Sequence, residues 1–436
     1  MRTTRRTTGF AAAMLVLSLL ALLLGACGSA NKNNDSSEGT ASPSPSESKK
    51  EPVMISLVTS ADWYNDTWKE IVKRYETHSG NKVDVQLLPG GKEFRKTVNT
   101  RLATQDFPDV LFYYGNQSVL GELQAEKNLV SFKDSEFVQR MTLTNFQGGY
   151  AAPVSGVNAS GVLYNKGVFE QLNIAVPQTY DELLAALETV KKAGITPVYV
   201  SGKDAWTLQL FSFAGFANVF KDRPDVMEQI NTHKLTFPEI PELGDLLRKQ
   251  VELKEKGYYN DDLFSATYDG MHEALANGTA AMTFTFTTAL PAILSKYPDA
   301  DIGMFPLPYQ DNYVQIFEPN AAYVFKNAKH ASEGQAFIDY ITSPEILEYY
   351  YGEIKEIPVF RGINVEPDPI TAPLTAVVLE GKTGTDFAGS TIAPISPFDT
   401  TLQDMLLGNL TPDQVTETIQ ANMEKAAKLA GVPEFK

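Results

Sequence analysis

The segment Val53-Met54-Ile55-Ser56-Leu57-Val58 is a short apolar run that predicts a buried parallel strand. After it, the spacing of the apolar residues changes to that of a helix. Asp66 is expected to cap this helix, which ends near Ser79-Gly80. Three further segments continue the alternation as strand, helix and strand: Val83 to Leu87, Phe94 to Gln105, and Asp109 to Tyr114. Because strands that alternate with helices form parallel crossovers, the series predicts an α/β lobe.

A second series of the same kind begins at Gly161-Val162-Leu163-Tyr164-Asn165-Lys166. Thr179 and Glu182 form a capping box before a helix that Gly194 ends, and Thr196 to Val200 is the next strand. Further helices are expected at Pro241–Lys256, Gly270–Ala276 and Ser332–Thr342. A last helix is expected to start at Thr411-Pro412-Asp413-Gln414 and to end at Leu429. The chain of 436 residues is too long for one ordinary core, so we expect two α/β lobes.

The chain starts with a hydrophobic leader. Arginines at positions 2, 5 and 6 precede an apolar run over 10–26, which closes with Leu24-Gly25-Ala26-Cys27. This layout is typical of a secretory signal over 1–26, and a cysteine after the small pair resembles the lipobox of bacterial lipoproteins. We therefore expect Cys27 to carry a diacylglycerol. The alternatives are a plain signal peptide or a membrane helix, although the run is short for a span of ~20 residues.

Residues 28–51 contain no large apolar side chain, so 27–52 is expected to be a lipidated cysteine followed by a disordered tether. The tether would hold the protein at the outer face of the cell membrane through the lipid alone. Cys27 is the only cysteine, so no disulfide is expected. The net charge of −16 argues against a nucleic-acid partner, which needs clustered cations.

Sequence motifs for catalysis are absent. The histidines at 78, 233, 272 and 330 show no ligand spacing, so neither a metal nor a cofactor is expected. Pro89-Gly90-Gly91-Lys92 lacks the spacing of a phosphate loop, and no Gly-x-Ser-x-Gly elbow occurs. A glycosidase needs two facing carboxylates, and among 53 acidic residues no pair stands out. The sequence therefore predicts a protein that is not an enzyme.

Aromatic residues follow the ends of several predicted strands. Trp63-Tyr64 follows the first strand, Tyr114 and Asn116 follow the third, and Trp206 lies beside Asp204 after the Val200 strand. Ligands of open α/β sheets bind at these strand ends. Flat rings beside amide and carboxylate groups suit a sugar, whose C–H face stacks while its hydroxyls take hydrogen bonds. Some of these rings are alternatively core residues, as we expect for Trp68.

Six segments along the chain after the tether carry recognisable motifs. They are Leu102-Ala103-Thr104-Gln105-Asp106-Phe107-Pro108-Asp109-Val110, Leu163-Tyr164-Asn165-Lys166, Pro177-Gln178-Thr179-Tyr180-Asp181-Glu182-Leu183, Asn277-Gly278-Thr279-Ala280-Ala281-Met282, Ile302-Gly303-Met304-Phe305-Pro306-Leu307-Pro308, and the tail from Gln403 to Leu429. Each motif alone is weak, but their order and spacing are specific. Together they resemble the sugar-binding (family 1) group of extracellular solute-binding proteins of ABC importers.

The resemblance implies a two-lobed, periplasmic-binding-protein-like fold of type II, with three crossovers at a hinge. The first lobe would comprise 53–159 and 302–345, and the second 160–301 and 346–436. The solute would lie in the cleft, and hinge motion would close the lobes around it. Many relatives carry a stacking tryptophan where this chain has Thr283-Phe284-Thr285-Phe286-Thr287-Thr288. Phe286 is the expected substitute, and the resemblance adds Glu318 and Phe398 to the site.

The resemblance implies a monomeric, lipid-anchored receptor that delivers a sugar to the permease subunits of an ABC importer. The strong negative charge keeps a second interpretation open, a receptor for a cationic solute such as a polyamine. A surface-anchored glycoside hydrolase and a sensory or adhesive lipoprotein without a transporter are further alternatives.

Overall fold

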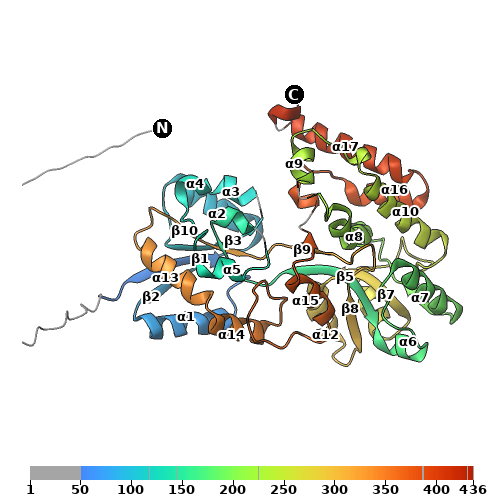
Figure 1. Ribbon diagram of the computed structural model, residues 1–436, viewed down its shortest axis with the longest axis horizontal. Helices are drawn as coiled ribbons and strands as arrows, with labels where there is room; N and C mark the ends of the chain where they lie inside the picture. Colours follow the sequence, from blue (N-terminus) through green and yellow to red (C-terminus); the bar gives the residue numbers. More distant parts are fainter. Residues whose placement is uncertain are drawn as a thin grey trace, which may run out of the picture. The chain divides into compact units, whose positions relative to one another are not determined.

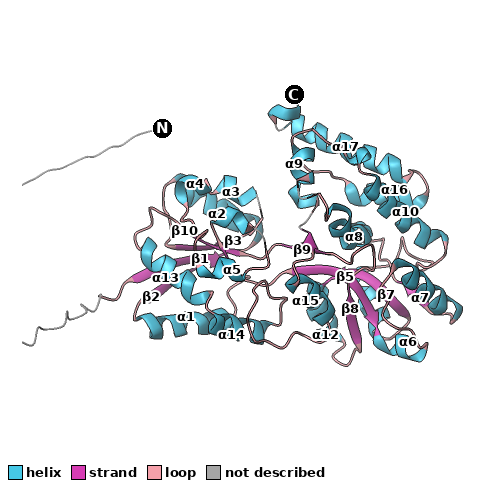
Figure 2. Ribbon diagram, in the orientation of Figure 1, coloured by secondary structure: helices cyan, strands magenta, loops and turns pink. Residues whose placement is uncertain are grey.

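The computed structural model describes residues 51–116, 118–143, 145–223, 225–384, 387–429 and 431–435. Within them lie two β-sheets, each covered by helices (Figures 1 and 2). The predicted leader, Cys27 and most of the tether lie outside the described residues. No helix in the described ranges is both long and apolar enough to cross a bilayer.

The first sheet has the strand order β2-β1-β3-β10-β4. Strands β1, β2 and β3 are parallel, whereas β10 is antiparallel to both β3 and β4. The bounds of its strands are β1 Met54–Ser60, β2 Lys82–Leu88, β3 Val110–Tyr113, β4 Ala152–Pro153 and β10 Ala321–Val324. The helices of this half are α1 Asp66–Ser79, α2 Gly91–Ala103, α3 Ser118–Glu122, α4 Ala125–Asn128, α5 Glu136–Arg140, α13 Ala331–Ile341 and α14 Pro344–Ile354.

The second sheet has the order β11-β9-β5-β7-β6, with β8 also paired to β5. Its strands are β5 Asn158–Asn165, β6 Thr196–Val198, β7 Ala280–Phe286, β8 Ile302–Phe305, β9 Val314–Phe317 and β11 Thr383–Gly384. Its helices are α6 Lys166–Gln171, α7 Tyr180–Lys192, α8 Leu210–Phe220, α9 Val226–Asn231, α10 Pro241–Glu255, α11 Tyr268–Ala276, α12 Leu290–Lys296, α15 Ala372–Leu379, α16 Phe398–Leu407 and α17 Pro412–Leu429.

The central strand β5 shows how the second sheet is buried on both faces. Leu163 belongs to one buried apolar cluster, shared with α11, α12 and α15, and the adjacent Val162 belongs to the other, shared with α7, α8, α10, α16 and α17. Successive side chains of a strand point to opposite faces, so a doubly covered strand is apolar throughout.

Asp109 explains why the Pro-Asp-Val segment opens β3. Its carboxylate is 2 % exposed and accepts hydrogen bonds from the backbone N–H of Ser56 (2.8 Å) and of His330 (2.6 Å), and from the Ser56 hydroxyl (2.9 Å). A buried carboxylate is stable only when such donors surround it. Asp109 thereby joins β1, β3 and the segment before α13 at the amino end of β3, opposite the strand ends that Trp63 and Tyr114 follow.

Two local predictions need correction. The cap of α1 is Asn65 rather than Asp66, because the Asn65 side chain accepts from the Trp68 backbone N–H at 3.0 Å and Asp66 is already helical. The lobe boundaries are also wrong in part. Residues 302–317 were expected in the first lobe, yet β8 and β9 pair with β5 of the second sheet. Conversely α14, expected to belong mainly to the second lobe, packs against α1 and α13.

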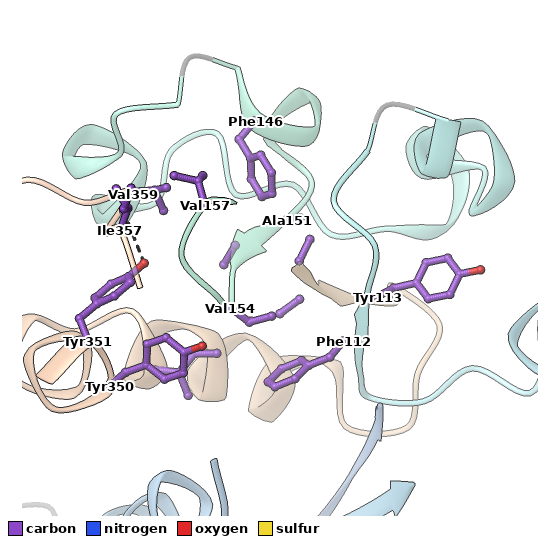
Figure 3. Packing of buried hydrophobic residues seen from close by; sticks show 14 of the residues in the cluster. Phe112, Tyr113, Phe146, Ala151, Val154, Val157, Tyr350, Tyr351, Ile357 and Val359 are labelled. Atoms are coloured by element: carbon purple, nitrogen blue, oxygen red, sulfur yellow. Dashed lines mark hydrogen bonds between the residues drawn. The ribbon is translucent and has the colours of Figure 1, made fainter. Parts of the chain in front are cut away.

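The chain passes between the two sheets three times, as the resemblance implied. The crossings are 154–157 between β4 and β5, 318–320 between β9 and β10, and the segment after α14. They are bonded to one another: Val154 N–H donates to the Asn320 carbonyl (2.9 Å) and Val157 N–H to the Ile357 carbonyl (3.0 Å). Figure 3 shows Val157 beside Ile357 and Val359, with the Tyr351 hydroxyl bonded to the Val359 N–H.

Candidate functional site

A cleft of about 470 Å³ opens where the three crossings meet. Its walls come from all three crossings, from the turn after β7 and from the start of α12. The lining residues include Ser155, Gly156, Val157, Asn158, Thr287, Thr288, Leu290, Phe317, Glu318, Asn320, Lys355, Glu356, Ile357, Asp368 and Thr371. This volume is within the range of small-molecule sites, about 300–1,000 Å³.

Polar groups held in place by hydrogen bonds lie within the otherwise mainly apolar lining of the cleft. Asn158, at the start of β5, accepts from the Thr287 hydroxyl (3.0 Å) and from the Thr288 backbone N–H (3.2 Å). The Thr287 hydroxyl also accepts from the Ala159 N–H at 3.2 Å. The turn after β7 is therefore fixed against the first crossing, and amide and hydroxyl groups lie at the surface of the cleft. Such groups match the hydroxyls of a sugar.

Glu356 joins two of the crossings. Its carboxylate accepts from the Gly156 N–H at 2.6 Å and from the Tyr350 hydroxyl at 3.1 Å. The residue is exposed over part of its surface, but its carboxylate is packed between these groups, and this desolvation raises the pKa of Glu356 despite the two hydrogen bonds. A Cβ on Gly156 would lie 2.5 Å from the Glu356 Cβ, so only glycine fits there.

Phe286, the expected stacking residue, does not itself line this cleft. It is half-buried, and its ring packs edge-on against that of Phe317 at 4.9 Å between centres. Phe317 does line the cleft, and the tilted ring of Phe213 lies 5.9 Å from that of Phe286 on another side. Of the residues predicted from the sequence, Glu318 lines the cleft directly. Phe286 thus supports the cleft through Phe317, and its own stacking role stays a prediction.

Four predicted residues lie at the carboxyl ends of β1 and β3. The rings of Trp63, Tyr114 and Phe94 form what we call the aromatic wall, with Trp63 edge-on to Tyr114 at 5.1 Å and to Phe94 at 5.3 Å. Burial, reinforced by Glu76, raises the pKa of the half-buried Tyr64 hydroxyl. Asn116 is exposed just beyond Tyr114. The structure therefore brings Trp63 and Tyr114 together, as the strand-end argument predicted.

The aromatic wall rests on a charged network. Glu122 accepts from the Tyr113 hydroxyl at 2.6 Å and from the Arg95 guanidinium at 3.0 Å. The Arg95 guanidinium lies 5.5 Å from the centre of the Tyr114 ring, a cation–π contact. Burial and the nearby Glu122 raise the pKa of the Tyr113 hydroxyl, which keeps it neutral and donating.

Trp206 and Asp204 lie together in the second half, near the start of α11. Trp206 is 41 % exposed, and its ring leans on Tyr268 at 5.0 Å between centres. The Asp204 carboxylate accepts from the Tyr268 backbone N–H at 2.7 Å, so Asp204 serves to hold the loop against α11. Tyr268 was not predicted, because nothing in its helical pattern distinguishes it from a core residue.

The prediction that Phe398 belongs to the site is wrong. The residue is 3 % exposed in the apolar cluster of the second half, with its ring 6.2 Å from that of Phe216. It opens α16 and packs inward, so it is removed from the candidate site. Asn158, Thr288 and Phe317 were missed as site residues; the threonine-rich run after β7 was the one signal that could have identified Thr288. Across the described ranges no group of acidic, histidine or cysteine side chains is arranged to hold a metal ion.

Two helix-covered sheets, three crossings and a cleft where the crossings meet define a two-lobed solute-binding protein. The profile of the family described as "Bacterial extracellular solute-binding protein" matches residues 61–347, and the chain belongs to that family.

Known proteins with similar sequences include the Multiple sugar-binding protein of Streptococcus mutans, 26 % identical over 385 residues, covering 84 % of this chain and 86 % of that one. The Melibiose/raffinose/stachyose-binding protein MelE of Bacillus subtilis is 23 % identical over 347 residues and covers 76 % of each chain. Among solved structures, the apo form of RafE from Streptococcus pneumoniae superimposes with a TM-score of 0.73 at 22 % identity, covering 86 % of this chain and 98 % of RafE. That likeness shows the fold.

Proposed function

We propose that the protein is the substrate-binding component of an ABC importer and that it captures a neutral oligosaccharide in the cleft described above. The relatives named for sugar binding support the class of ligand. The observation that carries the proposal is the combination, in the lining of the cleft, of amide and hydroxyl groups at Asn158, Thr287 and Thr288 with the aromatic ring of Phe317. That combination suits a sugar. The aromatic wall lies outside that lining, and we propose that it meets the sugar when the two halves close.

Release of an unchanged solute needs no covalent chemistry. The relatives are binding proteins, and we propose that this chain is one as well. The hinge formed by the three crossings would let the two halves close on the sugar and present the closed surface to the permease. We further propose that the receptor is a monomer and that a diacylglycerol on Cys27 anchors it at the outer face of the membrane.

A calorimetric titration against a panel of neutral mono- and oligosaccharides tests the ligand class. We expect binding of at least one oligosaccharide, weakened by Trp63→Ala and unchanged by Tyr349→Ala. Tyr349 is a suitable control because it lies on α14 with its ring beside Arg74 of α1, and it belongs neither to the cleft lining nor to the aromatic wall. Absence of any carbohydrate binding, with intact folding, contradicts the proposal.

The charges of the cleft favour one alternative, a cationic solute such as a polyamine. Three carboxylates, those of Glu318, Glu356 and Asp368, line the cleft together with a single cation, Lys355. Glu318→Gln and Asp368→Asn discriminate between the two ligands. If the ligand is a cation, its affinity falls and becomes less sensitive to salt in these variants. Sugar affinity depends instead on the aromatic residues.

Mass spectrometry of the protein from membranes tests the anchor, because a diacylglycerol adds a defined mass to Cys27. Cys27→Ser should release the protein into the medium. Chromogenic glycosides test the absence of catalysis, and steady turnover of any of them contradicts the receptor proposal.

A further inference from the structure

A second polar pocket, of about 420 Å³, lies on the first half of the molecule and shares no lining residue with the cleft. It is formed by the end of α2, the α3–α4 region and the segment after β10. We call it the amide pocket, because five of its lining residues carry carboxamides: Asn99, Gln105, Gln124, Asn128 and Asn327.

These amides differ in how they are held. Asn128 donates to the Leu123 carbonyl at 2.9 Å, and Gln124 accepts from Lys127 at 3.3 Å. The side chains of Asn99, Gln105 and Asn327 make no hydrogen bond to other described residues. They are exposed residues from two segments of the chain, the end of α2 with the turn after it and the segment after β10, and they line one pocket. Three such amides offer both donors and acceptors to a ligand.

The two rim glutamines lie at helix ends. Gln105 (φ 59°) follows Thr104, the C-cap of α2, and Gln124 (φ 50°) is the N-cap of α4, both in the left-handed region. These helix ends place the two glutamines in the lining of the pocket.

The charges of the pocket disfavour a cationic ligand, because Glu122 accepts from the Tyr113 hydroxyl and is already paired with Arg95. Lys127 donates to the neutral Gln124 amide at 3.3 Å and keeps its positive charge. Phe107 adds apolar surface, and its ring stacks on Phe325 at 5.0 Å. Amides with one aromatic ring match a neutral, polyhydroxylated molecule.

We propose that the amide pocket is a second, weaker carbohydrate site, which holds one sugar unit on the first half outside the cleft. The inference rests on the proposed function only for the ligand class. The two sites share no lining residue, and Glu122, which lines the amide pocket and binds Arg95 next to the aromatic wall, is left unchanged in the variants used below.

NMR titration of the isotope-labelled protein with stachyose and a panel of neutral oligosaccharides tests this site. The readout is the side-chain amide signals of Asn99, Gln105 and Asn327, which we expect to shift at sugar concentrations above those that saturate the cleft. The shifts should persist in Trp63→Ala, in which cleft binding is weakened.

The triple variant Asn99→Ala/Gln105→Ala/Asn327→Ala should lose roughly tenfold in affinity at the second site, as expected for a few neutral hydrogen bonds. Its cleft affinity, measured by calorimetry, should stay unchanged. Gln171→Ala, an exposed glutamine on α6, is the matched control and should change neither site.

The outcomes separate the two proposals. If calorimetry shows cleft binding and the three amide signals do not move, the second site is wrong and the proposed function stands. If no sugar binds in the cleft but the amide signals shift, the proposed function fails and the second site stands. If neither responds to any sugar, both are wrong.

Discussion

The two aromatic regions of this protein differ in how firmly their tryptophans are held. Trp63 is half-buried between Tyr114 and Phe94, both edge-on to it, and the charged pair Arg95–Glu122 supports the wall from behind. Trp206 is 41 % exposed and leans on Tyr268 alone among the described rings. A ring that is already ordered loses little conformational entropy when a ligand binds. Trp63 is therefore a preorganised surface, and Trp206 is one that the ligand must order.

The largest effect is expected from Trp63→Ala. Because the aromatic wall is proposed to contact the sugar, removal of this preorganised ring should cost more than about 2 kcal/mol, so we expect sugar affinity to fall about 100-fold. Trp63→Phe should retain most of the affinity, because Phe can still pack against Tyr114. Calorimetry measures both variants. Equal losses for Trp63→Ala and Trp206→Ala would remove the distinction between the two regions.

The hinge joins the halves that carry the two aromatic regions. Gly156→Ala tests how closely the first and third crossings of the hinge pack against each other. A Cβ at this position would lie 2.5 Å from the Glu356 Cβ and 2.6 Å from the Ile357 carbonyl oxygen. Neither neighbour is the free end of a flexible side chain, so the first and third crossings must separate. We expect a loss of about 2 kcal/mol in the free energy of unfolding, typical of overpacking.

Chemical denaturation measures that loss, and Gly352→Ala serves as its control because a Cβ there meets nothing within 4 Å. If Gly156→Ala is as stable as Gly352→Ala, the crossings are more compliant than their contacts indicate.

A smaller effect is expected at Trp206. Because ordering this exposed ring cancels part of its contact energy, Trp206→Ala should weaken sugar binding only about fivefold. Tyr268→Ala should cause a similar loss because it removes the ring that supports Trp206, whereas Tyr268→Phe should leave the affinity unchanged because the supporting ring remains. Calorimetric titration of the three variants is decisive. A loss in Tyr268→Ala much larger than in Trp206→Ala would mean that Tyr268 itself contacts the sugar.

Local patterns in the sequence predicted most elements correctly. The start of α17 is an example: a helix start was predicted at Thr411-Pro412-Asp413-Gln414, and there Thr411 accepts from the Gln414 N–H (3.2 Å) and Gln414 from the Thr411 N–H (2.8 Å), the reciprocal bonds of a capping box. The misplaced lobe boundary has a physical reason. Pairing of β8 and β9 with β5 joins segments far apart in the chain, and the period of a strand carries no information about its partner.

The site was predicted in part for a similar reason. The strand-end argument found Trp63 and Tyr114, because parallel strands bring their carboxyl ends to one edge. It gave no means of separating Phe398, whose ring packs into the core, from a ring that faces a ligand. Asn158 was missed because its role depends on the turn at Thr287 and Thr288, which lies more than a hundred residues away in the chain.

The smallest effect concerns pH at the hinge. Desolvation raises the pKa of Glu356 above its ordinary value of 4.5, so the folded protein holds the proton more tightly than the unfolded chain does. The resulting stability is present at pH values below the ordinary pKa and is lost as pH rises through the raised one. Glu356→Gln keeps an oxygen for the Gly156 N–H and removes the charge. We therefore expect the melting temperature of Glu356→Gln, relative to that of the unmodified protein, to rise between acidic and neutral pH. If the melting temperatures of the two proteins change with pH in parallel, the carboxylate is already well solvated at the hinge.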